Sequence, residues 1–205
     1  VNTAVGYRSL YKTTTGCANT ALGNCALYCN TTGCRNVAIG AWAMQCGAGT
    51  YNVAMGYNTM QCTTGSNNTG LGYNAMLKNT SGNNNIAVGR SALYTNTTGC
   101  NNTAVGYHAL CSNTTAKFNT AVGYQALMDN TTGTYNAALG YRAAFNVSTG
   151  CQNTASGYNA LYCATTGCKN VAVGTNAGCV ITTGHCNIAI GAGSGPTCGS
   201  FCNTI

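Results

Sequence analysis

Residues 119–135 read NTAVGYQALMDNTTGTY, and this seventeen-residue phrase recurs with variations along the whole chain. Every copy begins with an asparagine, and consecutive copies start 17 or, less often, 16 residues apart. These first asparagines are Asn2, Asn19, Asn36, Asn52, Asn68, Asn85, Asn102, Asn119, Asn136, Asn153, Asn170, Asn187 and Asn203. Counted from its asparagine, each copy has positions 1 to 17. So short a period indicates one structural unit that is stacked many times.

The first half of the phrase has the pattern of a short strand. Position 3 is alanine in eleven of the twelve complete copies, and position 5 is glycine in all twelve. Positions 2 and 4 are mostly Thr, Val, Ile, Leu or Met, so large and small residues alternate. Position 8 is small and position 9 is Leu or Met in nine copies, which predicts a second strand. The Asn-Thr-Thr-Gly that follows predicts a turn.

Two short strands and two turns fit one coil of a β-solenoid. We therefore predict an all-β fold, a parallel β-roll or β-helix of twelve coils, in a single domain over residues 1–205. Coils about 4.8 Å apart would give a rod about 58 Å long. Val5, Leu22, Ile39 and their successors at position 4 would form an apolar ladder. The small-residue face would contact another chain, and from this we expect a homotrimer.

Composition excludes several classes of function. The eight basic residues are spread over the whole length rather than clustered, which argues against nucleic-acid binding. No apolar run is long enough for membrane insertion. Asp129 is the only carboxylate side chain, and His108 and His185 lie in different copies, so we expect no enzymatic activity and no cofactor. The chain starts at Val1 and stops inside a copy, as expected of a mature product or a segment of a longer fibre.

Fifteen cysteines favour an oxidising, extracellular setting. No C-x-x-C occurs, so we do not expect a metal site. Two disulfide patterns fit the spacing. Turn-closing pairs within one coil are preferred: Cys29 with Cys34, Cys163 with Cys168, Cys179 with Cys186, and Cys198 with Cys202. The alternative joins equivalent positions of adjacent coils, as in Cys17–Cys34 and Cys151–Cys168, because the coil spacing suits a disulfide.

Two further columns concern sugars. Candidate N-glycosylation sequons in the predicted outward turn begin at Asn30, Asn79, Asn96, Asn113 and Asn130, although a repeat rich in Asn and Thr creates sequons automatically. Tyrosine recurs at position 6, for example at Tyr107, Tyr124 and Tyr141. This column either stacks on glycans or packs ring against ring, and the second interpretation is favoured.

The chain also resembles known families. Residues 36–40 (NVAIG) and 187–194 (NIAIGAGS) resemble the repeats in YadA-like heads of trimeric autotransporter adhesins. Residues 119–133 resemble repeats of phage and viral tail-fibre proteins. The resemblance implies an extracellular, rod-like trimer used for attachment or as a shaft.

Our leading hypothesis is an extracellular structural protein, a fibre shaft or filament subunit that self-associates head to tail or as a homotrimer. The alternative is a receptor-binding adhesin or tail fibre that binds cell-surface glycans. An ice-binding surface would need an outward threonine column at position 2, and the Val and Ile in that column suggest an interior face instead.

Overall fold

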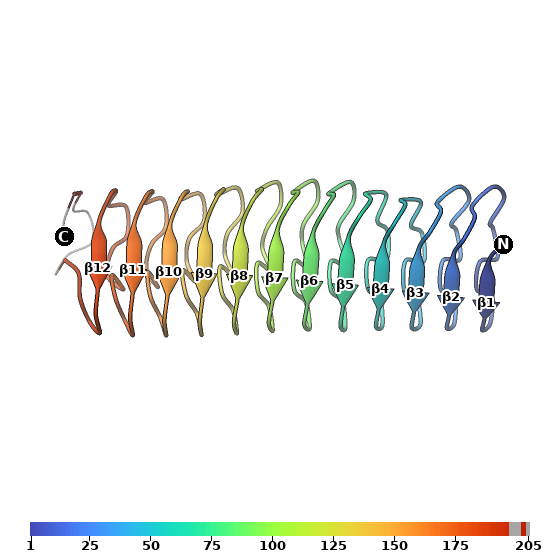
Figure 1. Cartoon of the computed structure of the whole chain (residues 1–205), viewed down its shortest axis with the longest axis horizontal. Helices are drawn as coiled ribbons and strands as arrows, with labels where there is room; N and C mark the ends of the chain where they lie inside the picture. Colours follow the sequence, from blue (N-terminus) through green and yellow to red (C-terminus); the bar gives the residue numbers. More distant parts are fainter. Residues whose placement is uncertain (197–201, 204–205) are drawn as a thin grey trace.

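The computed structural model describes residues 1–196 and 202–203 and places them in a straight stack of coils. Each coil contributes one strand, and the strands lie side by side along the long axis in chain order (Figure 1). They are β1 (Thr3–Val5), β2 (Thr20–Leu22), β3 (Val37–Ile39), β4 (Val53–Met55), β5 (Thr69–Leu71), β6 (Ile86–Val88), β7 (Thr103–Val105), β8 (Thr120–Val122), β9 (Ala137–Leu139), β10 (Thr154–Ser156), β11 (Val171–Val173) and β12 (Ile188–Ile190). All neighbours pair in parallel, so the predicted β-solenoid is confirmed. The described residues contain no helix that could span a lipid bilayer.

Glycine at position 5 ends each strand because the next coil lies too close for a side chain. Gly40 has a φ of +126°, and a Cβ built on it would lie 2.5 Å from the carbonyl oxygen of Gly56 in the next coil. An L-residue would therefore be strained twice, by its backbone and by the contact. The glycine thus sets both the turn and the close approach of neighbouring coils.

The apolar core is a thin column inside the coils. Ala121 in the strand and Ala126 and Leu127 in the opposite segment are all fully buried, and their equivalents join them in one continuous cluster. The second strand predicted at positions 8 and 9 is wrong. Successive strand residues point to opposite faces, whereas both of these side chains point inward. Leu127 has a φ of 50°, so this segment is a turn in which a left-handed residue aims its side chain at the core.

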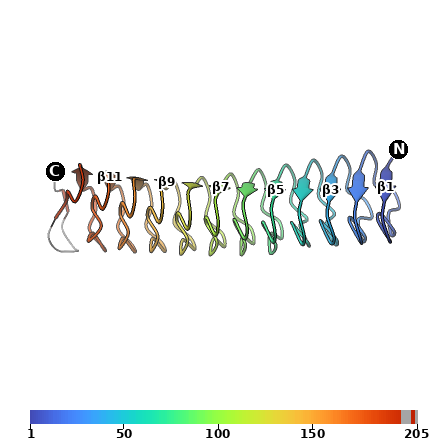
Figure 2. The ribbon, with the colours of Figure 1, turned by 90° about the horizontal axis from the view of Figure 1, so that it is seen from below.

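The bulky residues of each strand face outward, on the edge of the coils that carries the sheet in Figure 2. At position 4 of their strands, Val5, Leu139 and Ile190 are 56%, 57% and 68% exposed. Ala138, which precedes Leu139 at position 3, is only 2% exposed. The small-residue face therefore packs within its own chain. It is not available to contact another chain, which was the reason for expecting a homotrimer. Position 2 is outward as well, as Ile86 at 44% exposure illustrates, so its expected interior placement is also wrong.

A buried asparagine ladder at position 1 joins all the coils. The backbone N–H of Asn119 donates to Oδ1 of Asn102 at 3.0 Å, and Nδ2 of Asn119 donates to the carbonyl oxygen of Gly133 at 2.9 Å. Asn136 repeats both bonds one coil further on, to Asn119 and Gly150. Each side chain thus links its own turn to the adjacent coil. Because these groups are buried, leaving one unpaired would cost about 1–3 kcal/mol.

A second buried ladder occupies position 12, but only in the middle of the rod. Nδ2 donates to Oδ1 of the preceding coil from Asn96 to Asn79 at 2.7 Å, from Asn113 to Asn96 at 2.6 Å and from Asn130 to Asn113 at 3.1 Å. The ladder stops where Val147 takes this position, and Oδ1 of Asn130 is left buried without a partner.

Candidate functional site

The tyrosine column at position 6 is a stack of rings. Tyr107, Tyr124, Tyr141 and Tyr158 follow one another with ring centroids 5.1 Å apart and planes within 8° of parallel. Their rings are 36–50% exposed at the edges, but each inner ring has a neighbour on both faces. A sugar stacks on the face of an aromatic ring, and those faces are covered along the column. The geometry favours ring-to-ring packing over glycan stacking, in agreement with the interpretation favoured from the sequence.

Arg90 takes the place of tyrosine in the sixth coil and bridges two segments of the column. Its guanidinium carbon lies 5.4 Å from the ring centre of Tyr73 on one side and 5.8 Å from that of Tyr107 on the other. The cation therefore continues the stack by cation–π contacts. This position in the rod is consequently a structural junction.

A hollow of about 330 Å³ lies beside this junction and is a candidate for a small-molecule site. Its lining is Tyr73, Asn74, Arg90, Ser91, Tyr94, His108 and Cys111. Burial, and then Arg90, lowers the pKa of His108, while burial, and then Asp129, raises the pKa of Cys111. Both groups are therefore biased toward their uncharged forms near neutral pH, and no carboxylate lines the hollow to activate either.

His108 also has a buried ring nitrogen, Nδ1, without a hydrogen-bond partner. It occupies position 7 of its coil, and the asparagines at position 7 of three other coils have a buried, unpaired Oδ1 in the same way: Asn58, Asn74 and Asn159. The unpaired acceptor is thus a feature of the repeat rather than of this hollow.

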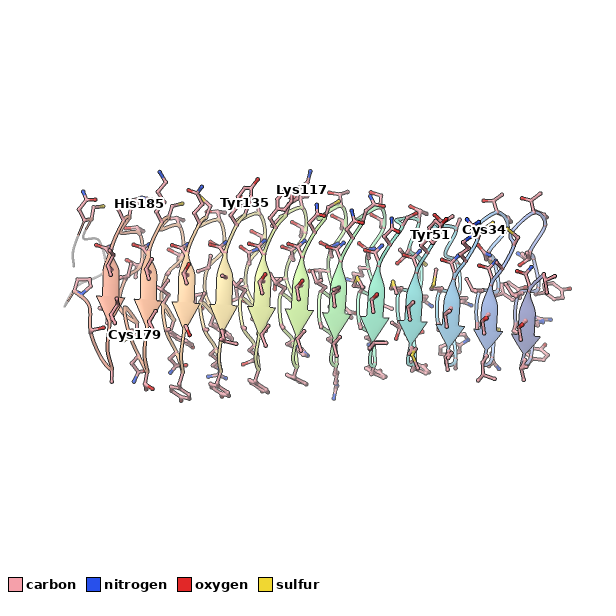
Figure 3. The ribbon with its side chains drawn as sticks, viewed as in Figure 1. Cys34, Tyr51, Lys117, Tyr135, Cys179 and His185 are labelled. Atoms are coloured by element: carbon pink, nitrogen blue, oxygen red, sulfur yellow. The ribbon has the colours of Figure 1, made fainter. Side chains whose placement is uncertain are left out.

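The contacts of the cysteines run from coil to coil. Sγ of Cys34 lies 2.9 Å from Sγ of Cys17 in the preceding coil, and Sγ of Cys168 lies 2.9 Å from that of Cys151. Within residues 1–196 and 202–203, no contact joins Cys29 to Cys34 or Cys163 to Cys168. Figure 3 shows Cys34 and His185 on one edge of the rod and Cys179 near the opposite edge. The remaining predicted pair includes Cys198, which lies outside the described residues. Cys202 accepts a hydrogen bond at Sγ from the backbone N–H of His185.

Cys29, Cys46 and Cys62 form a second cysteine column, at position 11 of three successive coils. Cys46 lies between the other two, so both act on its thiol. Burial, followed by these two neighbours, raises the pKa of Cys46 to about 11. Its thiol is therefore protonated near neutral pH. In the described part of the chain, no three His, Cys, Asp or Glu side chains gather closely enough to hold a metal ion.

The predicted glycosylation sites lie inside the coil. Asn30, Asn79, Asn96, Asn113 and Asn130 are all 0% exposed. Their Nδ2 atoms, to which a glycan would be attached, donate hydrogen bonds to buried oxygens, as Asn96 does to Asn79 and Gly99. The expected outward placement of these side chains is wrong, and the folded coil has no room for a sugar at them. The signal in the sequence was the recurrence of a polar residue at one position of successive coils, which is the pattern of a buried ladder.

Compared with known proteins, the chain matches no family model, no curated protein and no solved structure.

Proposed function

We propose that this chain is a structural protein, a shaft segment or filament subunit of an extracellular fibre. The observation that carries the proposal is the continuity of the connections between coils. One parallel sheet and one buried asparagine ladder run through the stack, so a bend at any coil would break both. Because each coil is joined to its neighbours in this way, the stack would act as a stiff rod.

The chemistry of the side chains supports a mechanical role. The titratable groups of the hollow, His108 and Cys111, are biased toward their neutral forms, and the tyrosine rings of position 6 stack on one another. The contacts between cysteines of neighbouring coils support an oxidising, extracellular setting, because thiols so placed can join in pairs there.

Self-association is part of the proposal. Positions 2 and 4 of the twelve strands carry no charged residue, position 4 is apolar in eleven of them, and six of these eleven side chains are more than 40% exposed. A contiguous exposed apolar surface of this kind marks an interaction face. Sedimentation of a Leu139→Lys variant tests this point: the wild-type chain should sediment as an assembly and the variant as a monomer. Asn101→Lys is the matched control, because it adds the same charge at an exposed site away from the sheet and should leave the assembly intact.

Antibody labelling tests the fibre itself. Antibodies raised against the purified chain should decorate thin extracellular fibres in electron micrographs of the cells or particles that make it. Serum adsorbed beforehand with the purified chain gives the background. Label confined to the cell interior, with bare fibres outside, would overturn the proposal.

A further inference from the structure

Two pairs of cysteines repeat one arrangement in two separate parts of the rod. Cys17 and Cys34 occupy position 16 of the first two coils, and Cys151 and Cys168 occupy position 16 of the ninth and tenth. In each pair the two sulfurs lie 2.9 Å apart. In each pair the backbone N–H of the first cysteine also donates to the sulfur of the second, at 3.1 Å. The repetition shows that the arrangement follows from the coil geometry.

This geometry suits a covalent bond. Equivalent residues of hydrogen-bonded coils are about 4.8 Å apart, which lies within the 4.4–6.8 Å range of Cα separations in disulfides. The sulfurs are already in contact, so a small rotation about the Cα–Cβ bonds brings them to bonding distance. Cys17 is exposed and Cys34 is partly exposed, so a soluble oxidant can reach them.

We propose that Cys17–Cys34 and Cys151–Cys168 are coil-to-coil disulfide bonds in the mature protein. Each bond forms by exchange with a small-molecule disulfide such as oxidised glutathione. The thiolate of one cysteine attacks this disulfide, gives a mixed disulfide and releases one thiol. The thiolate of the second cysteine then displaces the other thiol. Two protein thiols are oxidised, and the small disulfide is reduced to two thiols.

The environment of the first pair favours one cysteine as the attacking group. The hydrogen bond from Cys17 lowers the pKa of the Cys34 thiol, and the same contact raises the pKa of Cys17. The thiolate is the reactive form, so Cys34 makes the first attack and Cys17 resolves the mixed disulfide. This order places the mixed disulfide on the sulfur that Cys17 already contacts.

Peptide mapping tests the connectivity directly. The chain is purified without reductant, its free thiols are alkylated during unfolding in acid, and it is digested with trypsin and chymotrypsin. Cleavage after Tyr28, Tyr158 and Tyr162 separates the partners of both proposed bonds. We expect peptide 13–28 linked to peptide 29–35, and peptide 146–158 linked to peptide 163–169, with fragmentation locating the bonds at the four named cysteines. Recovery of Cys34 bonded to Cys29 and Cys168 bonded to Cys163, or of all four cysteines alkylated, would overturn the proposal.

A stability measurement separates these bonds from the other cysteines. Reductant should lower the thermal midpoint of the wild-type chain by about 5–10 °C. The double variant Cys17→Ser with Cys151→Ser should melt at the reduced wild-type temperature and should not respond to reductant. Cys100→Ser is the matched control, because Cys100 has the same position 16 but Asn83 and Lys117 as its neighbours, and it should respond like the wild type. An equal response of the double variant to reductant would contradict the proposal.

Discussion

Coils 5 to 8, residues 68–135, and coils 1 to 4, residues 2–67, share one backbone path but hold position 12 differently. The middle coils carry the complete ladder from Asn79 to Asn130. The first four coils have Thr13, Asn30, Gly47 and Thr63 there, and the hydroxyls of both threonines are buried without a partner.

The contacting cysteines lie where this ladder is interrupted. Cys17 contacts Cys34 within coils 1 to 4, whereas the described contacts of coils 5 to 8 include no sulfur–sulfur pair. The position 1 ladder and the sheet suffice to maintain the coil in both regions. The two regions therefore differ in their second side-chain connection between coils: a buried amide ladder in coils 5 to 8, and a sulfur contact between the first two coils in the other region.

The largest effect should come from position 5, which both regions share. In Gly123→Ala the new Cβ would meet the carbonyl oxygen of Gly140 in the next coil, at a backbone φ of +138°. We expect a loss of about 2–4 kcal/mol in the free energy of unfolding, measured by urea denaturation. Gly193→Ala is the control, because Gly193 also has a positive φ, +65°, but nothing lies within 4 Å of its Cβ. Equal losses in the two variants would show that the close approach of the coils is not what requires glycine.

The next effect tests whether the middle ladder acts as a unit. Asn96→Ala and Asn113→Ala should each cost about 1–3 kcal/mol by leaving buried amide groups unpaired. Because the two side chains are bonded to each other, the double variant should depart from additivity by about 1 kcal/mol. Asn30 bonds only within its own turn, to Gly33, so Asn30→Ala combined with Asn113→Ala should be additive. Urea midpoints of the three single and two double variants give the comparison, and additivity in both pairs would mean that the ladder has no cooperativity.

A substitution at the end of the ladder should extend it. Val147→Asn places an amide donor next to the unpaired Oδ1 of Asn130, and the new hydrogen bonds should offset the lost apolar burial to within about 1 kcal/mol. Ala164→Asn, one coil further, has Val147 and Ile181 as neighbours and should cost about 2–3 kcal/mol. If Val147→Asn costs as much as Ala164→Asn, the free acceptor on Asn130 does not attract a new rung.

The sequence was a good guide to the fold and a poor guide to the direction of its side chains. The invariant glycine and the alternation around Ala121 predicted the stacked strands, because both depend on local backbone geometry. The pair Ala126 and Leu127 was assigned to a strand because a left-handed leucine, with φ near 50°, has no signature in residue type. Asn96 points inward and Leu139 points outward, which reverses the usual preference of polar and apolar residues. The directions of these side chains follow from the narrow coil and not from the residue types. For Cys34 the spacing satisfies two patterns and the turn-closing pair with Cys29 is the preferred one, but the register of adjacent coils places its sulfur against Cys17 instead.

The smallest effect concerns the tyrosine column, which also differs between the two regions. Tyr124 has a ring on each face, whereas Tyr7 in the first coil has only the guanidinium of Arg8, 5.0 Å from its ring centre. Stacked rings contribute about 0.5–1.5 kcal/mol beyond their burial, so Tyr124→Ala should cost about 1 kcal/mol more than Tyr7→Ala in urea denaturation. Native-state hydrogen exchange locates the loss: the amides of Gln125 and Arg142, which donate to the carbonyl oxygens of Tyr107 and Tyr124, should exchange faster in Tyr124→Ala, while those of the first coils should be unchanged. If exchange accelerates in the first coils as well, a local defect spreads along the rod, and the stack responds as one cooperative unit rather than as coils joined to their neighbours.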